Sequence, residues 1–453
     1  MKTNTKTQKY TPRSDEKTSV FVPLFIFCLI IPSFVHIGSV RLTPYLLILM
    51  ALFFPCLFTW IRGAAGKVNL IDVLIVAATI WQCLALILSA DLSRTIEPVG
   101  IVLLQFLGAY LVGRTLVRNK AGFVALIRSF GITLMILLPF SVIETLTARN
   151  VYLNLFKIIG PVHQESLMEP RLGLDRAQVA FEHPILFGVY CASGFALVLV
   201  GLKHVWPTLL RQFSSVVVMT TTFLSLSTGA LLALTTQMGI LCWGFVFRRS
   251  EARWKILGAC FTCAYVFVDV VSNRTPFHVF VDYMTFNQGT AYNRILIWEY
   301  GTASVGKYPF FGLGIFGDEW ERPYFMSPSM DNFWLVIAVR YGFPAFFLLA
   351  AAFVVLLFRM GMRKQLDEMT SDLRAAAIIS LIGVFFAICS VHLWNATMCW
   401  LMFLAGSCVW MTNEGSSLKE IKISESKKVH QPHANKSARA LRHKRNISRR
   451  EDA

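Results

Sequence analysis

Long apolar runs alternate with short polar intervals along most of the chain. Twelve of these runs are close to the twenty residues that a helix needs to cross a hydrocarbon core of roughly 30 Å. Each run is continuous, whereas a strand of a membrane barrel would alternate apolar and polar positions over about ten residues. The pattern predicts about twelve helical spans, at 19–38, 42–61, 70–90, 97–112, 123–143, 183–201, 213–227, 229–247, 254–271, 333–358, 375–394 and 396–411.

Two places leave the number of spans open. The fourth run, 97–112, has a weak signal because it begins with a charged residue. Only the stretch Ser-Leu-Ser-Thr-Gly at 225–229 separates the seventh run from the eighth. This stretch fits either a tight turn between two spans or one broken helix. Eleven or thirteen spans would therefore also agree with the pattern.

The composition agrees with a membrane protein. Hydrophobic residues make up 55% of the chain and charged residues only 15%, and the mean hydropathy is +0.57. These values exclude a water-soluble globular protein and a disordered one. The predicted fold class is all-α, a polytopic transmembrane helical bundle.

The basic charge of the chain reflects its expected topology. The net charge is +17, from 43 lysines and arginines against 26 acidic residues. If the N-terminus is cytoplasmic, most basic residues fall on the cytoplasmic side, as the positive-inside rule requires. We therefore expect no nucleic-acid partner. The prediction divides the chain into a cytoplasmic segment 1–18, a transmembrane domain 19–411, and a basic, disordered cytoplasmic tail 412–453 that is attracted to anionic membrane lipid.

Two segments on the outer side are too long to be simple connectors. They are the loops 144–182 and 272–332, and both are rich in aromatic and apolar residues. Long loops commonly carry function, and this composition favours ordered structure. Short helices are expected at 151–160, before Pro161, and at 291–305. No internal repeat of the kind found in many transporters is visible.

The cysteines and histidines give no sign of a cofactor. All ten cysteines lie in apolar runs, where we expect them to act as small buried hydrophobic side chains. Cys260 and Cys263 have the spacing of a redox or metal pair, but they lie in the middle of a predicted helix with no second pair nearby. The histidines on the outer side are scattered. We expect neither a cofactor nor a metal site.

Four passages resemble a known family when they are taken together and in order. They are Arg-Ala…Phe-Glu-His-Pro-Ile…Gly at 176–188, Leu-Ser-Leu-Ser-Thr-Gly-Ala-Leu-Leu-Ala-Leu at 224–234, Arg-Ile-Leu-Ile-Trp…Pro-Phe-Phe-Gly-Leu-Gly at 294–314, and Asp-Asn-Phe-Trp-Leu…Arg-Tyr-Gly at 331–342. With this topology, the chain resembles the O-antigen ligase and polysaccharide polymerase superfamily. The signature arginines of that family fall on Arg176, with Arg171 as its near rival, and on Arg294.

The resemblance implies a metal-independent, inverting membrane glycosyltransferase. Such an enzyme polymerises oligosaccharide repeats carried on polyprenyl pyrophosphate into an exopolysaccharide or O-antigen. It would lie in the bacterial inner membrane with both termini in the cytoplasm and its active site facing the periplasm. A chain-length co-polymerase and a flippase are candidate partners. The sugar repeat and its linkage stay open.

Other functions compete with the polymerase. An O-antigen ligase would move a finished glycan to lipid A core with the same chemistry. A flippase or another transporter would need charged residues threaded through the bundle, whereas here they gather in the outer loops. A purely structural membrane protein would not explain two ordered loops that carry arginines on the outer side.

One position departs from the ligase pattern. Ligases of this superfamily usually carry a histidine just before the asparagine that opens the tenth span, and this chain has Asp331 there. The difference favours a polymerase and leaves the identity of the catalytic base open. Asp331 followed by asparagine before an apolar run is also typical of a helix N-terminus.

The arginines suit the reaction that the resemblance implies. Transfer of the glycan leaves a polyprenyl pyrophosphate behind, and a guanidinium can grip phosphate oxygens with two parallel donors in place of a divalent cation. Arg176 and Arg294 are therefore predicted to be catalytic, and Arg171 to bind substrate. In the structural alternative these side chains only form ion pairs, with Asp175, Glu169, Glu182 and Glu299 as the partners.

An acceptor hydroxyl must lose a proton as it attacks. Asp331 is the predicted catalytic carboxylate, with Glu182, His183 and Glu299 as further candidates for the base. His183 is otherwise expected to bind substrate.

Two more residues are predicted to bind substrate. Arg340 would lie about 13 Å of helix rise past Asp331, where an unpaired charge in the membrane is unfavourable. It must therefore face a wet cavity or a partner. Either it binds the substrate pyrophosphate or it forms a structural pair. Trp298 lies four residues after Arg294, so one helix would present both on the same face.

Overall fold

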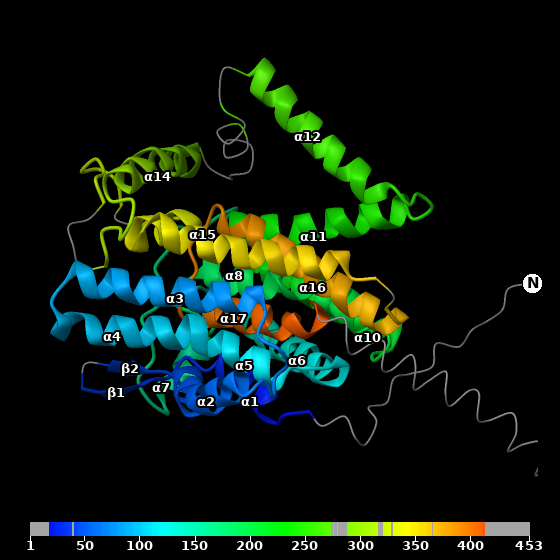
Figure 1. The fold of residues 1–453 in the computed structure, drawn as a ribbon, viewed down its shortest axis with the longest axis horizontal. Helices are drawn as coiled ribbons and strands as arrows, with labels where there is room; N and C mark the ends of the chain where they lie inside the picture. The colour runs from blue at the N-terminus through cyan, green and yellow to red at the C-terminus, as the bar shows by residue number, and fades with distance from the viewer. Residues whose placement is uncertain are drawn as a thin grey trace, which may run out of the picture.

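The computed structural model describes residues 18–412 except 39, 273–274, 276–278, 280–287, 316–319, 328 and 365. The predicted segment 1–18 and tail 412–453 therefore lie almost wholly outside the described residues, as does much of the first half of the loop 272–332. The described chain is mostly helical, and its two described strands form one short hairpin (Figure 1). The elements of the first part are α1 (Phe21–Cys28), β1 (Val35–Ile37), β2 (Val40–Leu42), α2 (Pro44–Ile61), α3 (Leu70–Ser89), α4 (Leu92–Val102), the π-helix η1 (Leu103–Gly108), α5 (Ala109–Leu116), α6 (Lys120–Thr147) and α7 (Val151–Lys157).

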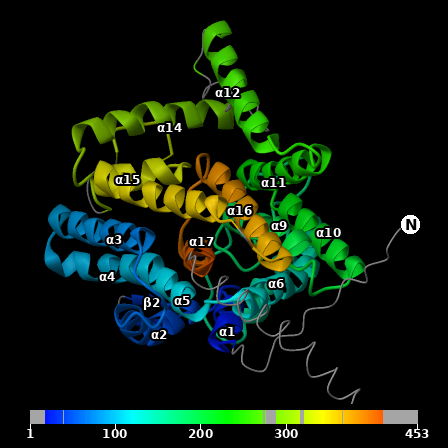
Figure 2. The ribbon, with the colours of Figure 1, turned by 45° about the vertical axis from the view of Figure 1, so that its right-hand side comes forward.

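The second part of the chain completes the bundle. Both views show most long helices packed side by side, with α14 lying along the first half of α15 and α12 standing apart (Figures 1 and 2). The elements are α8 (Pro184–Ala192), α9 (Gly194–Ala196), the π-helix η2 (Leu197–Gly201), α10 (Thr208–Leu224), α11 (Thr228–Val246), α12 (Arg253–Val271), α14 (Gln288–Lys307), α15 (Phe333–Met362), α16 (Glu368–Ile388), α17 (Asn395–Cys408) and the 3-10 turn η3 (Val409–Thr412).

Hydropathy predicted the fold class correctly. Every one of the twelve apolar runs contains a helix. Within the described residues, nine helical segments are long and apolar enough to cross a membrane. The helices α1, α10 and α17 fall short of that length, with 8, 17 and 14 residues. The structure therefore confirms a polytopic helical membrane fold but not the predicted count of twelve spans.

The first apolar run does not form one continuous helix. Helix α1 ends at Cys28, and an antiparallel hairpin of β1 and β2 follows, with His36 opposite Arg41. Pro32 explains the early end, because proline lacks the backbone N–H that a helix interior needs. The branched residues Val35 and Val40 then favour extended structure. The hairpin region is joined to the first long loop, because the Phe34 amide donates to the Pro161 carbonyl at 3.1 Å.

Local features of the two long loops match the sequence. Helix α7 begins at Val151 as predicted and ends at Lys157, and α14 covers the predicted helix 291–305. Residues 225–227 form a tight turn between α10 and α11, with Leu226 in the left-handed region at φ 45°. We call the end of the bundle where the loops 144–182 and 272–332 lie the loop end.

Helix α15 is broken near the loop end. Gly342 has φ 83° and ψ 170°, which are not helical. The released backbone pairs with the segment 309–314, which we call the docked loop. Leu313 donates to Val339 at 2.8 Å, and the Phe343 amide donates to the Pro309 carbonyl at 2.7 Å. The docked loop thus satisfies the backbone groups that the break exposes, as an apolar environment requires.

Helix α3 supports the docked loop from its other side. The Trp81 indole donates to the Phe310 carbonyl at 3.0 Å, and the Trp81 and Phe311 rings stack with centroids 5.2 Å apart. Gly314 lies so close to Ser89 that an added Cβ would collide with it. Residues from three distant parts of the chain therefore fix the backbone around Arg340.

We expect Gly342→Ala to disrupt this arrangement. A Cβ at this position would collide with the Phe310 carbonyl, and the positive φ is unfavourable for alanine. The variant should unfold at a lower temperature in detergent and should lose most of its activity, because the docked loop can no longer seat. Gly361→Ala is the matched control, since it lies in the same helix with open space around it. Equal thermal stability and activity of the two variants would contradict this view of the break.

Candidate functional site

A cavity of about 1030 Å³ lies at the loop end. Its walls come from the first long loop, the turn between α10 and α11, helix α14, the segment before α15, and α15 itself. Six of the seven site residues predicted from the sequence line it: Arg171, Arg176, His183, Arg294, Asp331 and Arg340. Trp298 does not line this cavity, and its side chain is 41% exposed. Residues that are up to 169 positions apart in the chain thus face one space.

The turn between α10 and α11 holds the first two arginines. Arg171 Nη1 donates to the Leu226 carbonyl at 2.8 Å, and Arg176 Nε donates to the Ser225 carbonyl at 3.3 Å. Each of these bonds uses one edge of the guanidinium. The remaining N–H groups are left for an anion in the cavity, because a guanidinium has five donors.

The backbone that carries Arg176 is anchored by Glu144, which the sequence prediction missed. This buried carboxylate at the end of α6 accepts hydrogen bonds from the amides of Gln178 and Val179 at 3.2 and 2.9 Å. Asn150 Nδ2 donates to it at 3.1 Å. Val179 is held in the left-handed region at φ 48°. The sequence signal that could have identified Glu144 is its position as a single carboxylate in the last turn of an apolar helix.

Arg294 reaches the cavity from α14. Its side chain is only 9% exposed, and its buried Nε has no hydrogen-bond partner among the described residues. Burial lowers the pKa of Arg294 from its ordinary value, and the negative charge of Asp331 opposes the change. A buried cation with an unused donor is unfavourable unless a ligand completes it.

Asp331 is the single carboxylate among the described residues that line the cavity. It does not cap α15, because the neighbouring Asn332 does so: its Oδ1 accepts from the Leu335 amide at 3.1 Å. Burial raises the pKa of the Asp331 carboxyl above its ordinary value. Three positive charges oppose this rise, in decreasing order those of Arg294, Arg176 and Arg171. The carboxylate therefore shares the cavity with these arginines and does not cap the helix.

His183 is poorly suited to accept a proton. Its Nδ1 already accepts from the Ile185 amide at 3.1 Å and so caps α8. Burial, together with the charges of Arg176 and Arg171, lowers its pKa to about 4. The ring is therefore neutral at neutral pH, and with Nδ1 as acceptor the proton lies on Nε2. His183 can donate a hydrogen bond into the cavity.

The other acidic candidates lie elsewhere. Glu182 Oε1 accepts from Asn395 Nδ2 at 3.0 Å and lies 3.8 Å from Arg41 Nη2. Neither Glu182 nor Glu299 lines the cavity. The ion pairs of the structural alternative are absent among these described residues: within 4.0 Å, Arg171 and Arg176 contact none of Asp175, Glu169 and Glu182, and Arg294 does not contact Glu299.

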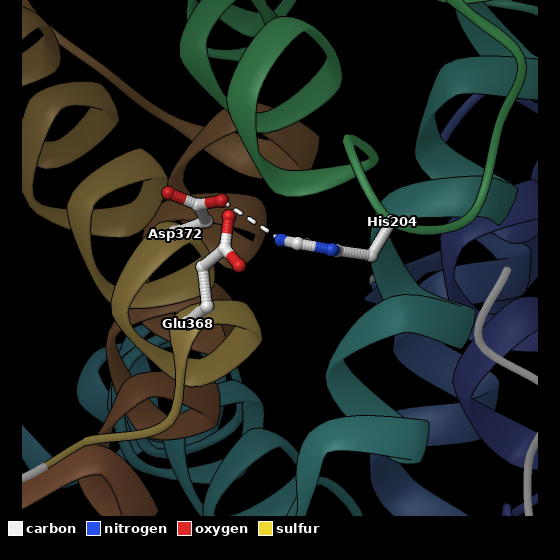
Figure 3. A group of neighbouring side chains, drawn as sticks. All are labelled: His204, Glu368 and Asp372. Atoms are coloured by element: carbon white, nitrogen blue, oxygen red, sulfur yellow. Dashed lines mark hydrogen bonds and ion pairs between the residues drawn. The ribbon is translucent and has the colours of Figure 1, made fainter. Parts of the chain in front are cut away.

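Among the described residues, one group could hold a metal ion, and it lies far from the cavity. His204, Glu368 and Asp372 offer ligand atoms within 4.8 Å of one another (Figure 3). The Lys203 ammonium already pairs with both carboxylates, at 3.0 and 2.9 Å, and supplies the positive charge there. The 18-residue segment from Pro184 to Gly201 separates this group from His183, which is about 27 Å of helix rise.

The comparison with known families agrees with the chemistry of the cavity. Residues 213–350 match the O-antigen ligase family. The matched region contains Arg294, Asp331 and Arg340, while Arg171 and Arg176 precede it. No curated protein matches the chain. Together with the membrane-spanning helices, the match confirms over residues 213–350 the resemblance to the O-antigen ligase and polymerase superfamily, a group of membrane enzymes that act on lipid-linked glycans.

Proposed function

We propose that the chain is a polysaccharide polymerase of the bacterial inner membrane. In this proposal it takes an oligosaccharide from polyprenyl pyrophosphate and attaches it to the end of another lipid-linked repeat at the periplasmic face. The main support is one observation: three arginines from two distant loops line one cavity together with a single described carboxylate, and their charges act on it. A reaction that expels a pyrophosphate and deprotonates a hydroxyl needs both kinds of group.

The reaction consists of one displacement. The acceptor hydroxyl oxygen attacks the anomeric carbon of the donor sugar, and the bond from that carbon to the pyrophosphate oxygen breaks. The hydroxyl proton passes to the Asp331 carboxylate. Polyprenyl pyrophosphate leaves with the bonding electron pair, and attack from the opposite side inverts the anomeric centre.

The arginines stabilise the leaving group. Negative charge grows on the pyrophosphate as the bond breaks, and preorganised donors in a site of low dielectric stabilise such charge strongly. Arg171 and Arg176 are preorganised by the turn carbonyls of Leu226 and Ser225. Arg294 approaches from α14 with its unused buried donor. A divalent cation is not required in this scheme, because guanidinium groups take its role.

The ligase remains the second candidate function, because the matching family is described as O-antigen ligase. The two candidates share the donor and the leaving group, and they differ in the acceptor. A polymerase extends the same lipid-linked repeat, whereas a ligase uses lipid A core. The residue at 331, aspartate instead of the histidine typical of ligases, favours the polymerase.

The decisive measurement is transfer by the purified protein in detergent or nanodiscs. With lipid-linked repeat units from the producing cells, we expect ladders of two or more repeats and release of polyprenyl pyrophosphate. The rate should be the same with and without EDTA. Product only upon addition of lipid A core would select the ligase, and no transfer to either acceptor would contradict the proposal. A strong loss of activity in EDTA would show that arginines alone do not replace a metal.

A further inference from the structure

A second cavity of about 430 Å³ adjoins the first. It lies between α4 and η1 on one side and α15 and the start of α17 on the other. The two cavities share a common wall made by Ile315, Val336, Arg340, His392 and Trp394. Most other residues of the second cavity are apolar, among them Ile101 and Phe106, and its further charged residues are Arg94 and Glu97. A molecule with an apolar part and an anionic head would therefore fit it.

The four arginines that line the first cavity divide into two groups. Arg171, Arg176 and Arg294 act on the carboxylate of Asp331. Arg340 is not among the charges that act on Asp331, and it acts instead on the ring of His392. The geometry agrees, because Arg340 lines both cavities while the other three arginines line only the first.

Arg340 forms no ion pair with a described carboxylate within 4.0 Å, although Glu97 lines the same second cavity. Its side chain is exposed to the cavities. Beside it, His392 Nδ1 is buried without a described partner. Burial and the charge of Arg340 lower the pKa of His392 to about 3, so the ring is neutral. The break at Gly342 and the docked loop fix the backbone of Arg340.

We propose that the second cavity binds the acceptor, with Arg340 holding the pyrophosphate of the acceptor lipid. The inference rests on the proposed function, since a polymerase uses two substrates that both carry a polyprenyl pyrophosphate. The two pyrophosphates have different fates. The donor pyrophosphate leaves and gains negative charge, which three arginines stabilise. The acceptor pyrophosphate keeps its bond and needs only to be positioned, for which one arginine beside an apolar groove is suitable.

The test separates the two lipids. The donor is a labelled lipid-linked repeat whose acceptor hydroxyl is methylated, so that it can only donate. Two acceptors are compared, a lipid-linked repeat and the same glycan on a phosphate-free alkyl chain. Wild-type protein should prefer the pyrophosphate-linked acceptor in kcat/KM. Arg340→Gln should reduce this preference by about 10- to 100-fold, the usual value of a charge-assisted hydrogen bond, and Arg340→Lys should retain part of it.

Two further variants keep the test specific. Ile101→Trp fills the second cavity without touching the first, and it should raise KM for the lipid-linked acceptor while KM for the donor stays the same. Arg359→Gln, an exposed arginine near the other end of α15, should keep the full preference. The inference would be overturned if Arg340→Gln left the preference for the pyrophosphate-linked acceptor unchanged. Equal losses of kcat/KM for both acceptors would overturn it as well. Absence of transfer by the wild-type protein would instead contradict the proposed function.

Discussion

Arg294→Ala should abolish polymer formation while the protein still folds and inserts. The alanine variant removes a preorganised donor to the leaving pyrophosphate, for which we expect a loss of about 10³-fold or more in transfer rate. Arg294 is a buried cation without an ion-pair partner among the described residues, so its removal should leave the thermal unfolding temperature unchanged or raise it. Rate and unfolding temperature are measured on the same purified sample.

The lysine variant distinguishes geometry from charge. Arg294→Lys keeps the positive charge but loses the two-donor fork, so it should also fail. Glu299→Gln is the matched control, since Glu299 lies on the same helix but does not line the cavity. Full activity of the lysine variant would show that only charge matters. An equal loss in the glutamine control would show that α14 is sensitive to any change.

Asp331→Asn should cost about 10² to 10⁴ in transfer rate, the usual contribution of a general base. The fold should persist, because Asn332 and not Asp331 caps α15. Binding of the lipid-linked donor should also persist, since the arginines remain. Asp331→His should keep more activity than the asparagine variant, because an imidazole can accept the proton. Near-normal polymer yield from the asparagine variant at matched expression would remove Asp331 from the mechanism.

The pH profile gives an independent check on Asp331. Its carboxylate must be ionised to accept a proton, so activity should fall as the pH decreases through the pKa of the folded protein. Burial raises that pKa above its ordinary value of 3.8, and the acidic limb should therefore lie above pH 3.8. The limb should disappear in the residual activity of Asp331→Asn. A limb that stays in place in that variant would belong to another group.

Some tertiary contacts changed the interpretation of single residues. The pattern at 331–332 fitted both a helix cap and a catalytic carboxylate, and the structure assigns the cap to Asn332. His183 and Glu182 were equal candidates for the base. Only the structure shows that the first uses its acceptor nitrogen on α8 and that the second interacts with Asn395 and Arg41.

The sequence by itself determined the membrane fold and six of the residues that line the main cavity. Hydropathy is a local property, so each apolar run indicated a helix, and arginines on the outer side stood out against the positive-inside rule. The break at Gly342, the docked loop and the anchor at Glu144 depended on the tertiary structure. Each depends on hydrogen bonds to backbone groups from segments more than about 25 positions away, such as the Phe343 amide to the Pro309 carbonyl and the Val179 amide to the Glu144 carboxylate. Such bonds leave no periodic signal in the sequence, because they satisfy backbone groups that every residue carries.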